Sequence, residues 1–181
     1  MNSKNSELIV INPKKMWFMG DDINTDLIIP SKYLTENDSK IIVEHAFEAL
    51  IKNFSKIVSK GDIIVAGKNF GCGSSREEAV FVVKELGISA IIAESFSRIY
   101  FRNLINQGIA AIIINNALNL LKYLDNIQIY LSNGILNGIN TKTNQSVEIK
   151  FKPLPNFLMN IINANGILNL IKSRIHHFIN I

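Results

Sequence analysis

The stretch Asp62-Ile-Ile-Val-Ala-Gly-Lys-Asn-Phe-Gly-Cys-Gly-Ser-Ser-Arg76 decides how this chain is expected to fold. It begins with Asp62–Ala66, an apolar run that is typical of a strand buried on both faces of a sheet. A glycine-rich loop follows. Ser75–Leu86 then has apolar side chains along one side and precedes Gly87, which predicts a helix with a glycine C-cap. A strand that passes through such a loop into a helix begins an α/β unit, with the loop at the carboxyl end of the strand.

The next segments of the chain repeat this pattern. Ser89–Ala93 predicts a second buried strand, Ser97–Gln107 a short helix that ends at Gly108, and Ile109–Ile114 a third strand. The β-α-β-α-β order implies a parallel sheet with right-handed crossovers. The chain is therefore predicted to belong to the α/β class.

Before this core, the sequence predicts four further elements. Lys15–Gly20 is expected to be a first strand, and Asp26–Pro30 a short strand that stops at its proline. Ser31–Ser39 is polar and is expected to be a loop. Lys40–Asn53 has apolar residues near the helical period, which predicts an amphipathic helix.

After residue 120 the periodic signal is weaker. Ile127–Leu131 and Val147–Phe151 are predicted to be strands of an added antiparallel section. Asn133-Gly134 and Asn137-Gly138 are the expected turns between strands. The segment Phe157–Ile181 is expected to form one or two C-terminal helices, broken near its glycine.

Composition limits the classes of function. The chain has 181 residues, of which 48% are hydrophobic, and neither an internal repeat nor a linker is visible, so one domain spanning residues 1–181 is expected. The net charge is +4 with the basic residues spread along the chain, which argues against nucleic acid binding. No apolar stretch could span a bilayer and no secretory leader is recognisable, so a soluble, cytoplasmic protein is expected.

The metal-binding side chains are few. Cys72 is the only cysteine, and the three histidines do not occur at metal-ligand spacing. We therefore expect this chain to form no disulfide and to hold no metal ion or cluster by itself.

The loop Gly67–Arg76 has the chemistry of an anion-binding site. Its glycines allow close approach of a ligand, Ser74 or Ser75 is expected to cap the following helix, and Arg76 offers a fork of donors to a carboxylate or phosphate. The loop matches neither a P-loop, nor a dinucleotide fingerprint, nor a nucleophile elbow. The residues alone leave two interpretations open, a small-anion site or an ordinary capped turn with a surface arginine.

Three sequence blocks resemble the small subunit of 3-isopropylmalate dehydratase, which is similar to the swivelling fourth domain of aconitase. The blocks are Asp22-Ile-Asn-Thr-Asp-Leu-Ile-Ile-Pro30, the stretch from Asp62 to Glu77, and Ile91-Ile-Ala-Glu-Ser-Phe-Ser-Arg-Ile-Tyr-Phe-Arg-Asn103. They occur in the order and at the spacing of that family. The resemblance implies a three-layer β/β/α swivelling domain with a parallel core.

The resemblance also implies roles for individual residues. Ser74 would be the base that removes a carbon-bound proton, Ser75 and Arg76 would contact a substrate carboxylate, and Gly73 and Asp26 would complete the substrate site. A serine alkoxide is costly to form, so Ser74 would need stabilisation from nearby N–H groups and from Arg76.

A partner and a cofactor follow from the same resemblance. In this family the large subunit holds a 4Fe-4S cluster that binds the substrate hydroxyl as a Lewis acid. The resemblance therefore implies a heteromeric hydro-lyase of leucine biosynthesis that acts on a small dicarboxylate and is inactive without its large subunit. Self-association of the isolated chain stays open. At Glu78 the chain departs from its relatives, which usually carry histidine there.

Substrate choice in this family depends on the loop that begins at Tyr33-Leu34. Homoaconitase-type relatives place arginine next and isopropylmalate-type relatives an apolar residue, whereas this chain has Thr35. A third carboxylate would meet no cation there and would be repelled by Glu36, which favours isopropylmalate. Homoaconitate, citramalate and dimethylmalate stay open as substrates, and a non-catalytic anion-binding module is the alternative of another class.

Two further arginines, Arg98 and Arg102, lie four residues apart on one predicted helix. They could steer an anionic substrate or a partner's surface. The alternative is a salt bridge to Glu94 or a solvated helix face.

Overall fold

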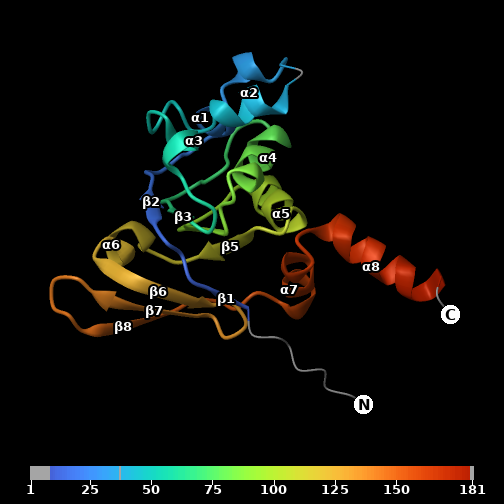
Figure 1. The fold of residues 1–181 in the computed structure, drawn as a ribbon. Helices are drawn as coiled ribbons and strands as arrows, with labels where there is room; N and C mark the ends of the chain where they lie inside the picture. Colours follow the sequence, from blue (N-terminus) through green and yellow to red (C-terminus); the bar gives the residue numbers. More distant parts are fainter. Residues whose placement is uncertain (1–8, 37, 180–181) are drawn as a thin grey trace.

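The computed structural model describes residues 9–36 and 38–179, which form two four-stranded sheets and several helices (Figure 1). The parallel sheet has the order β2-β3-β4-β5 and consists of β2 (Met16–Phe18), β3 (Ile63–Val65), β4 (Ala90–Ala93) and β5 (Ala110–Ile113). The antiparallel sheet has the order β1-β6-β7-β8 and consists of β1 (Val10–Ile11), β6 (Leu124–Tyr130), β7 (Ile135–Asn140) and β8 (Ser146–Lys150).

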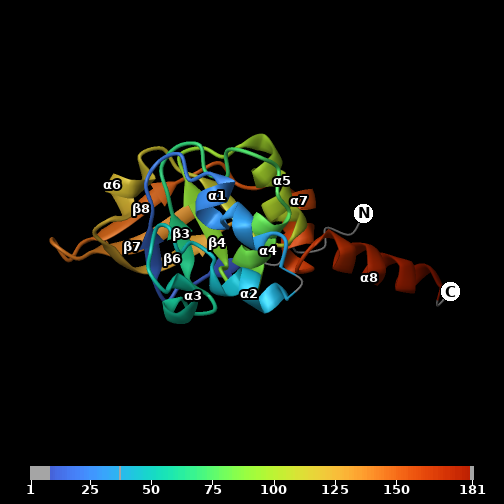
Figure 2. The same cartoon turned by 90° about the horizontal axis from the view of Figure 1, so that it is seen from above.

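Helices cover the face of the parallel sheet that points away from the antiparallel sheet. On this side lie α1 (Thr25–Ile28), α2 (Ser39–Glu44), α3 (Phe54–Ile57), α4 (Glu78–Glu85) and α5 (Arg98–Asn106). Seen from above, α1, α2 and α4 lie over the parallel strands (Figure 2). The three layers, antiparallel sheet, parallel sheet and helices, confirm the predicted β/β/α architecture.

Three further helices come after β5 in the sequence, one before β6 and two after β8. They are α6 (Ala117–Leu121), α7 (Asn156–Asn163) and α8 (Ile167–Ile179), and α8 extends away from the rest of the chain in both views (Figures 1 and 2). The predicted break near the glycine, Gly166, is confirmed, because α7 ends before it and α8 begins after it. No helix within the described ranges has both the length and the apolar character needed to cross a membrane.

The predicted parallel core is confirmed. Ile64 of β3 pairs with Ile91 of β4, and every residue of both strands is buried. Each of these fully buried aliphatic side chains contributes about 1.5–3 kcal/mol of hydrophobic stabilisation. Gly87 follows α4 with φ +74°, a left-handed conformation that explains why a glycine ends this helix.

The prediction of a strand over Asp26–Pro30 is wrong. This run begins inside the short helix α1, because the side chain of Asn24 accepts a hydrogen bond from the Leu27 N–H and caps the first turn. Ile28 and Ile29 are fully buried, so the apolar character of this run is explained by burial in the core and not by strand pairing.

The helix predicted over Lys40–Asn53 is shorter than expected, since α2 ends at Glu44. Phe47 adopts φ +57°, which a continuing helix could not include, and its N–H donates to the Ile28 carbonyl at 2.8 Å. Its ring is fully buried. Burial of this aromatic side chain therefore outweighs the helical pattern.

The Asn137-Gly138 pair is not a turn, because both residues lie inside β7. Opposite them, β6 has an irregular register between Asp125 and Gln128, and a Cβ on Gly138 would approach Ile127 Cδ1 to 2.8 Å. The glycine thus permits close approach of two strands. Gly134 does lie in a turn, as predicted.

Candidate active site

Two loops that follow neighbouring parallel strands run side by side. The Asp22 N–H donates to the Lys68 carbonyl at 2.8 Å, and the Thr25 N–H donates to the Cys72 carbonyl at 2.9 Å. The loop that follows β2 is therefore bound by its backbone to the loop that follows β3. This pairing brings Asp26 next to Arg76, although fifty positions separate them in the sequence.

A third segment, the start of α5 after β4, completes the arrangement. The Ser97 N–H donates to the Phe70 carbonyl at 3.0 Å, and the Ser97 hydroxyl donates to the Gly71 carbonyl at 2.6 Å. Ser97 also caps α5, since its Oγ accepts from the Tyr100 N–H. The carboxyl ends of three adjacent parallel strands thus meet at one site, where open α/β sheets bind ligands.

These segments enclose a cavity of about 360 Å³. Its lining residues are Gly71, Gly73, Ser74, Ser75, Arg76, Ser97, Arg98, Ile99, Tyr100 and Asn103. The structure therefore brings together all of the predicted motif residues from Gly73 to Arg76. It adds the first turn of α5, whose contribution the sequence motif alone did not indicate.

The Ser74 hydroxyl is exposed and lies beside a buried threonine. Thr25 Oγ1 is 3.4 Å from Ser74 Oγ and donates to the Ser74 carbonyl at 3.1 Å. Thr25 is 1% exposed, so its hydroxyl has a fixed position. The role of Thr25 was not predictable from the sequence, because a threonine in a short helix has no feature that marks it as part of a site.

Arg76 and Asp26 form a two-point ion pair. Arg76 Nη1 donates to Asp26 Oδ1 at 2.7 Å and Nη2 donates to Oδ2 at 3.3 Å, while Nη1 also reaches the Ile29 carbonyl at 3.5 Å. The hydrogen bond from Arg76 lowers the pKa of the Asp26 carboxyl below its ordinary value. Two parallel hydrogen bonds fix the plane of the guanidinium group at the edge of the cavity.

The prediction that Ser74 or Ser75 caps the next helix is wrong. The helix α4 begins at Glu78, and its N-cap residue Glu77 makes no side-chain cap hydrogen bond. Gly73 has φ +94°, and the Ser74 carbonyl is bonded to Thr25, so the chain cannot yet enter the helical conformation. Both serines are therefore free to face a ligand. Glu78 lies in the first turn of α4, as expected.

Gly71 has a close neighbour that explains its type. It has φ +73°, and a Cβ at this position would overlap the ring of Tyr100. Tyr100 is 2% exposed and donates its hydroxyl to the Ala79 carbonyl at 2.8 Å. Burial raises the pKa of the Tyr100 hydroxyl, which therefore stays protonated. The ring thus holds the loop of residues 67–76 in place beside α4 and α5.

Comparisons with known proteins agree with one another on the family of this chain. The sequence signature of the aconitase C-terminal domain matches residues 23–117. A relative from Clostridioides difficile, named 3-isopropylmalate dehydratase small subunit, is 46% identical and covers 85% of this chain and 92% of its own. A relative of the same name from Caldicellulosiruptor bescii is 42% identical over 86% of this chain and 91% of its own. The chain belongs to the 3-isopropylmalate dehydratase small-subunit family.

A solved structure supports the same assignment. The structure described as 3-isopropylmalate dehydratase from Methanocaldococcus jannaschii has a TM-score of 0.73 and 38% sequence identity, covering 92% of this chain and 95% of that one. The antiparallel sheet and the helices α7 and α8 lie outside the stretch matched by the aconitase C-terminal signature. The structural likeness extends to most of the chain.

The loop that the family resemblance links to substrate choice lies apart from the cavity. Ser31–Tyr33 forms a 3-10 turn, Leu34 packs partly against the core, and Thr35 is exposed. None of Tyr33, Leu34 and Thr35 lines the cavity around Ser74. Asn37, in the same loop, lies outside the described residues. The catalytic and specificity residues of the sequence prediction thus occupy different places.

Cys72 is a half-buried free thiol in the catalytic loop. Across the described side chains of residues 9–36 and 38–175, no group of three or more His, Cys, Asp or Glu residues is close enough to bind a metal ion.

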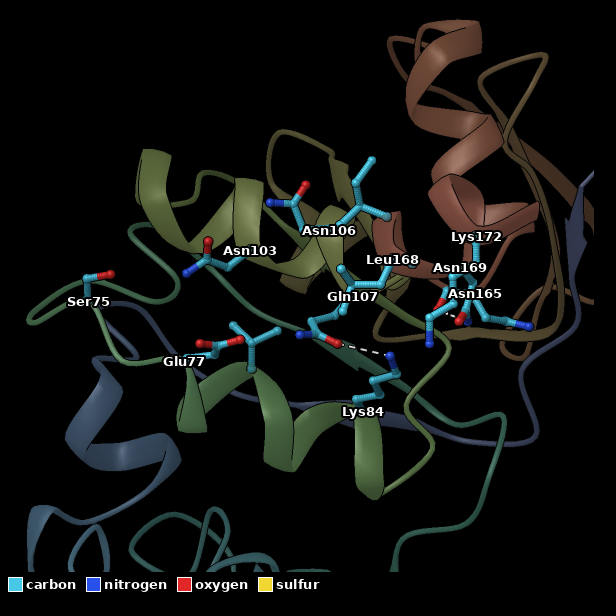
Figure 3. Close-up of a pocket in the computed structure, with 13 residues that line it drawn as sticks. Ser75, Glu77, Lys84, Asn103, Asn106, Gln107, Asn165, Leu168, Asn169 and Lys172 are labelled. Carbon is cyan, nitrogen blue, oxygen red and sulfur yellow. Dashed lines mark hydrogen bonds between the residues drawn. The ribbon is translucent and has the colours of Figure 1, made fainter. Parts of the chain in front are cut away.

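A second cavity of about 600 Å³ adjoins the first and shares Ser75 and Asn103 with it (Figure 3). Its walls come from α4, α5 and the start of α8, and the Lys84 ammonium donates to Gln107 Oε1 at 2.9 Å. Its other polar side chains are mostly amides: Asn103, Asn106, Asn165 and Asn169. This polar extension suits water or the polar end of a ligand better than an alkyl group.

Proposed function

We propose that this chain is the small subunit of a hydro-lyase that interconverts 2-isopropylmalate and 3-isopropylmalate by dehydration and rehydration in leucine biosynthesis. The observation that carries the proposal is the cavity lined by Ser74 and Arg76. Buried Thr25 lies beside Ser74, and Asp26 is paired with Arg76. Family membership supports it, because the relatives carry the name of this enzyme's small subunit.

Ser74 is the proposed base. In the proposed dehydration step, the Ser74 alkoxide accepts the carbon-bound proton of the substrate and becomes a neutral hydroxyl. In the rehydration step, this hydroxyl returns the proton to carbon, which restores the alkoxide. Thr25 Oγ1, at 3.4 Å, can turn its hydrogen bond from the Ser74 carbonyl toward Ser74 Oγ as negative charge develops there. Because Thr25 is buried, this donor is already in place before the reaction and needs little reorganisation.

Arg76 is the proposed carboxylate-binding residue, and Ser75 and Gly73 complete the contact surface beside it. The contacts of Arg76 with Asp26 and Ile29 leave guanidinium N–H donors for a ligand. Asp26 orients the guanidinium and helps to define its plane. A substrate carboxylate that binds there lies close to Ser74 in the same cavity.

The large subunit is the proposed partner, and its 4Fe-4S cluster supplies the Lewis acid for the substrate hydroxyl. The residues of this chain bind the substrate, orient it and move a proton at Ser74. Ser74, Ser75 and Asp26 are exposed on this chain, which is consistent with a site that a second subunit closes. We also propose that residues 1–181 form one domain and that the protein acts in the cytoplasm.

Isopropylmalate is the proposed substrate because the specificity loop offers no cation for a third carboxylate. Thr35 and Glu36 are both exposed there, and Glu36 is acidic. The alternative substrates are homoaconitate, citramalate and dimethylmalate. A panel of these acids, tested on the reconstituted complex, distinguishes them, and faster turnover of a tricarboxylate would overturn the assignment.

The decisive experiment replaces Ser74 in a complex reconstituted with a cluster-loaded large subunit. Ser74→Ala is expected to lower kcat by about 10²–10⁴-fold, the usual contribution of a general base. Subunit association, measured by calorimetry, should not change. Ser55→Ala is the control, because Ser55 lies on α3 and bonds the Glu44 carbonyl, away from the cavity. Full activity of Ser74→Ala would contradict the proposed base.

A further inference from the structure

The Asp26–Arg76 pair alone does not match the charge of a dicarboxylate. Arg76 contributes one positive charge, but Asp26 forms a two-point ion pair with it and cancels that charge. A ligand with two carboxylates would therefore add negative charge to a pair that is already neutral. A second cation that faces the cavity would correct this mismatch.

Arg98 is the other cation that lines the same cavity. It is the first residue of α5, its side chain is exposed, and among the described residues it forms no ion pair. The salt bridge between Arg98 and Glu94 that the sequence allowed is not among the ion pairs of the described residues. The Arg98 guanidinium thus keeps its full charge and its donors for a ligand.

The position of Arg98 is fixed relative to Ser74 from both sides. Before it, Ser97 donates its hydroxyl to the Gly71 carbonyl at 2.6 Å and its N–H to the Phe70 carbonyl at 3.0 Å. After it, the buried Tyr100 ring packs against Gly71. The backbone of Arg98 is therefore attached to the catalytic loop, and a cation on such a rigid base can orient a substrate.

We infer that Arg98 binds the second carboxylate of the substrate, while Arg76 binds the first. The cavity would then recognise small dicarboxylates through two separate arginines. This inference rests on the proposed function, because it assumes that the substrate binds beside Ser74. The start of α5 adds its N-terminal dipole to the charge of Arg98. Arg98 is thereby a substrate-binding residue outside the glycine-rich motif.

A competing role for Arg98 is contact with the partner subunit. Arg98 and Arg102 both line an apolar groove between α5 and α7, together with Phe101, Phe157 and other apolar side chains. Arg102 lies one turn after Arg98 on α5 and does not line the catalytic cavity. Arg102 is therefore a matched control, since only substrate binding should distinguish the two arginines.

The test uses the reconstituted complex with three variants, Arg98→Gln, Arg98→Lys and Arg102→Gln. Arg98→Gln should raise KM by about 10- to 100-fold, as expected for loss of a charged hydrogen bond, with a smaller effect on kcat. Arg98→Lys should recover part of the loss, because it keeps the charge but not the planar fork. Arg102→Gln should leave KM unchanged.

A binding measurement separates this inference from the proposed function. Calorimetry on the complex compares a dicarboxylate substrate analogue with its monoamide, which lacks one charge, and it needs no turnover. Arg98→Gln should weaken the dicarboxylate about tenfold or more and should weaken the monoamide much less. Equal losses for both ligands would overturn the inference. The inference would also be overturned if Arg98→Gln left KM unchanged and if Arg98→Gln and Arg102→Gln weakened subunit association equally. Failure of the wild type to turn over isopropylmalate would instead count against the proposed function.

Discussion

The proposed catalytic loop, residues 67–76, and the proposed specificity loop, residues 30–36, are attached to the fold in different ways. Backbone hydrogen bonds from two other segments fasten the catalytic loop, such as Gly71 N–H to the Ile23 carbonyl at 2.7 Å. The backbone hydrogen bonds described for the specificity loop are local, from Tyr33, Leu34 and Glu36 to residues three positions earlier. In the proposed function, the geometry of the reaction thus depends on backbone hydrogen bonds between segments, whereas substrate choice depends on a segment whose described backbone hydrogen bonds are local.

Side chains attach the specificity loop to the helical layer. The Tyr33 ring stacks on His45 with centroids 3.8 Å apart, His45 Nδ1 contacts Glu48 Oε2 at 2.5 Å, and Lys32 Nζ lies 3.5 Å from Glu48 Oε1. The contact with His45 lowers the pKa of the Glu48 carboxyl. These side chains are partly exposed, and each contact contributes little. The loop should therefore tolerate changes that would inactivate the catalytic loop.

The largest effect is expected from Gly71→Ala. The new Cβ would require a left-handed alanine and would overlap the Tyr100 ring, so unfolding free energy should fall by about 2–4 kcal/mol and activity should be lost. Urea denaturation measures the change. Gly61→Ala is the matched control, because Gly61 has φ +94° but open space for a Cβ. Equal losses in both variants would show that Tyr100 does not restrict the loop.

The parallel core was predictable from sequence because its strands are continuous apolar runs bounded by glycines. The elements that were mispredicted depend on long-range contacts. The α1 region contains a similar apolar run, yet the Asn24 cap makes it helical, and Phe47 leaves the helical conformation to reach the core. The two-residue strand β1 carries too little pattern to be recognised, and it exists because Val10 and Ile11 pair with β6.

The site was predictable in part for a similar reason. Ser74, Ser75 and Arg76 belong to one motif after a recognisable strand, so their common location followed from the sheet topology. Thr25 and Tyr100 act through contacts with residues far away in the sequence, and their types suggest only a helix and a core.

A smaller effect is expected from Asp26→Asn, which weakens the ion pair between Asp26, in the segment after β2, and Arg76, in the loop after β3. Misorientation of the guanidinium should lower kcat/KM by about 100-fold with little change in Tm, because Asp26 is exposed. Asp125→Asn, at an exposed position of β6, is the control. Arg76 lowers the pKa of Asp26, so the ion pair is present above the ordinary carboxyl value of 3.8 and is lost as pH falls through the lowered value. An Asp26-dependent pH profile near neutrality would contradict this geometry.

A still smaller effect is expected from His45→Ala, which removes the stack on Tyr33. Aromatic pairs of this kind contribute about 0.5–1.5 kcal/mol, so Tm should fall slightly and KM should rise a few-fold with kcat preserved. Limited proteolysis of the loop measures the same loosening. His45→Phe keeps the stack without the contact to Glu48 and should restore most of the KM. If kcat fell as severely as in Asp26→Asn, the two loops would not be independent.

The smallest effect is expected from Lys32→Ala. Lys32 is exposed, and its pair with Glu48 is long and easily screened by salt, so Tm should shift by less than about 2 °C and the shift should vanish at high ionic strength. Contacts with Tyr33 and Glu48 raise the pKa of Lys32. The contribution of Lys32 is therefore complete below the ordinary value of 10.5 and is lost only as pH rises through the raised value.

The same small shift in Tm should appear when Lys32→Ala is made in the His45→Ala background, if Lys32 acts separately from the stack. A shift larger than that of His45→Ala would mean that charge, and not stacking, attaches the specificity loop.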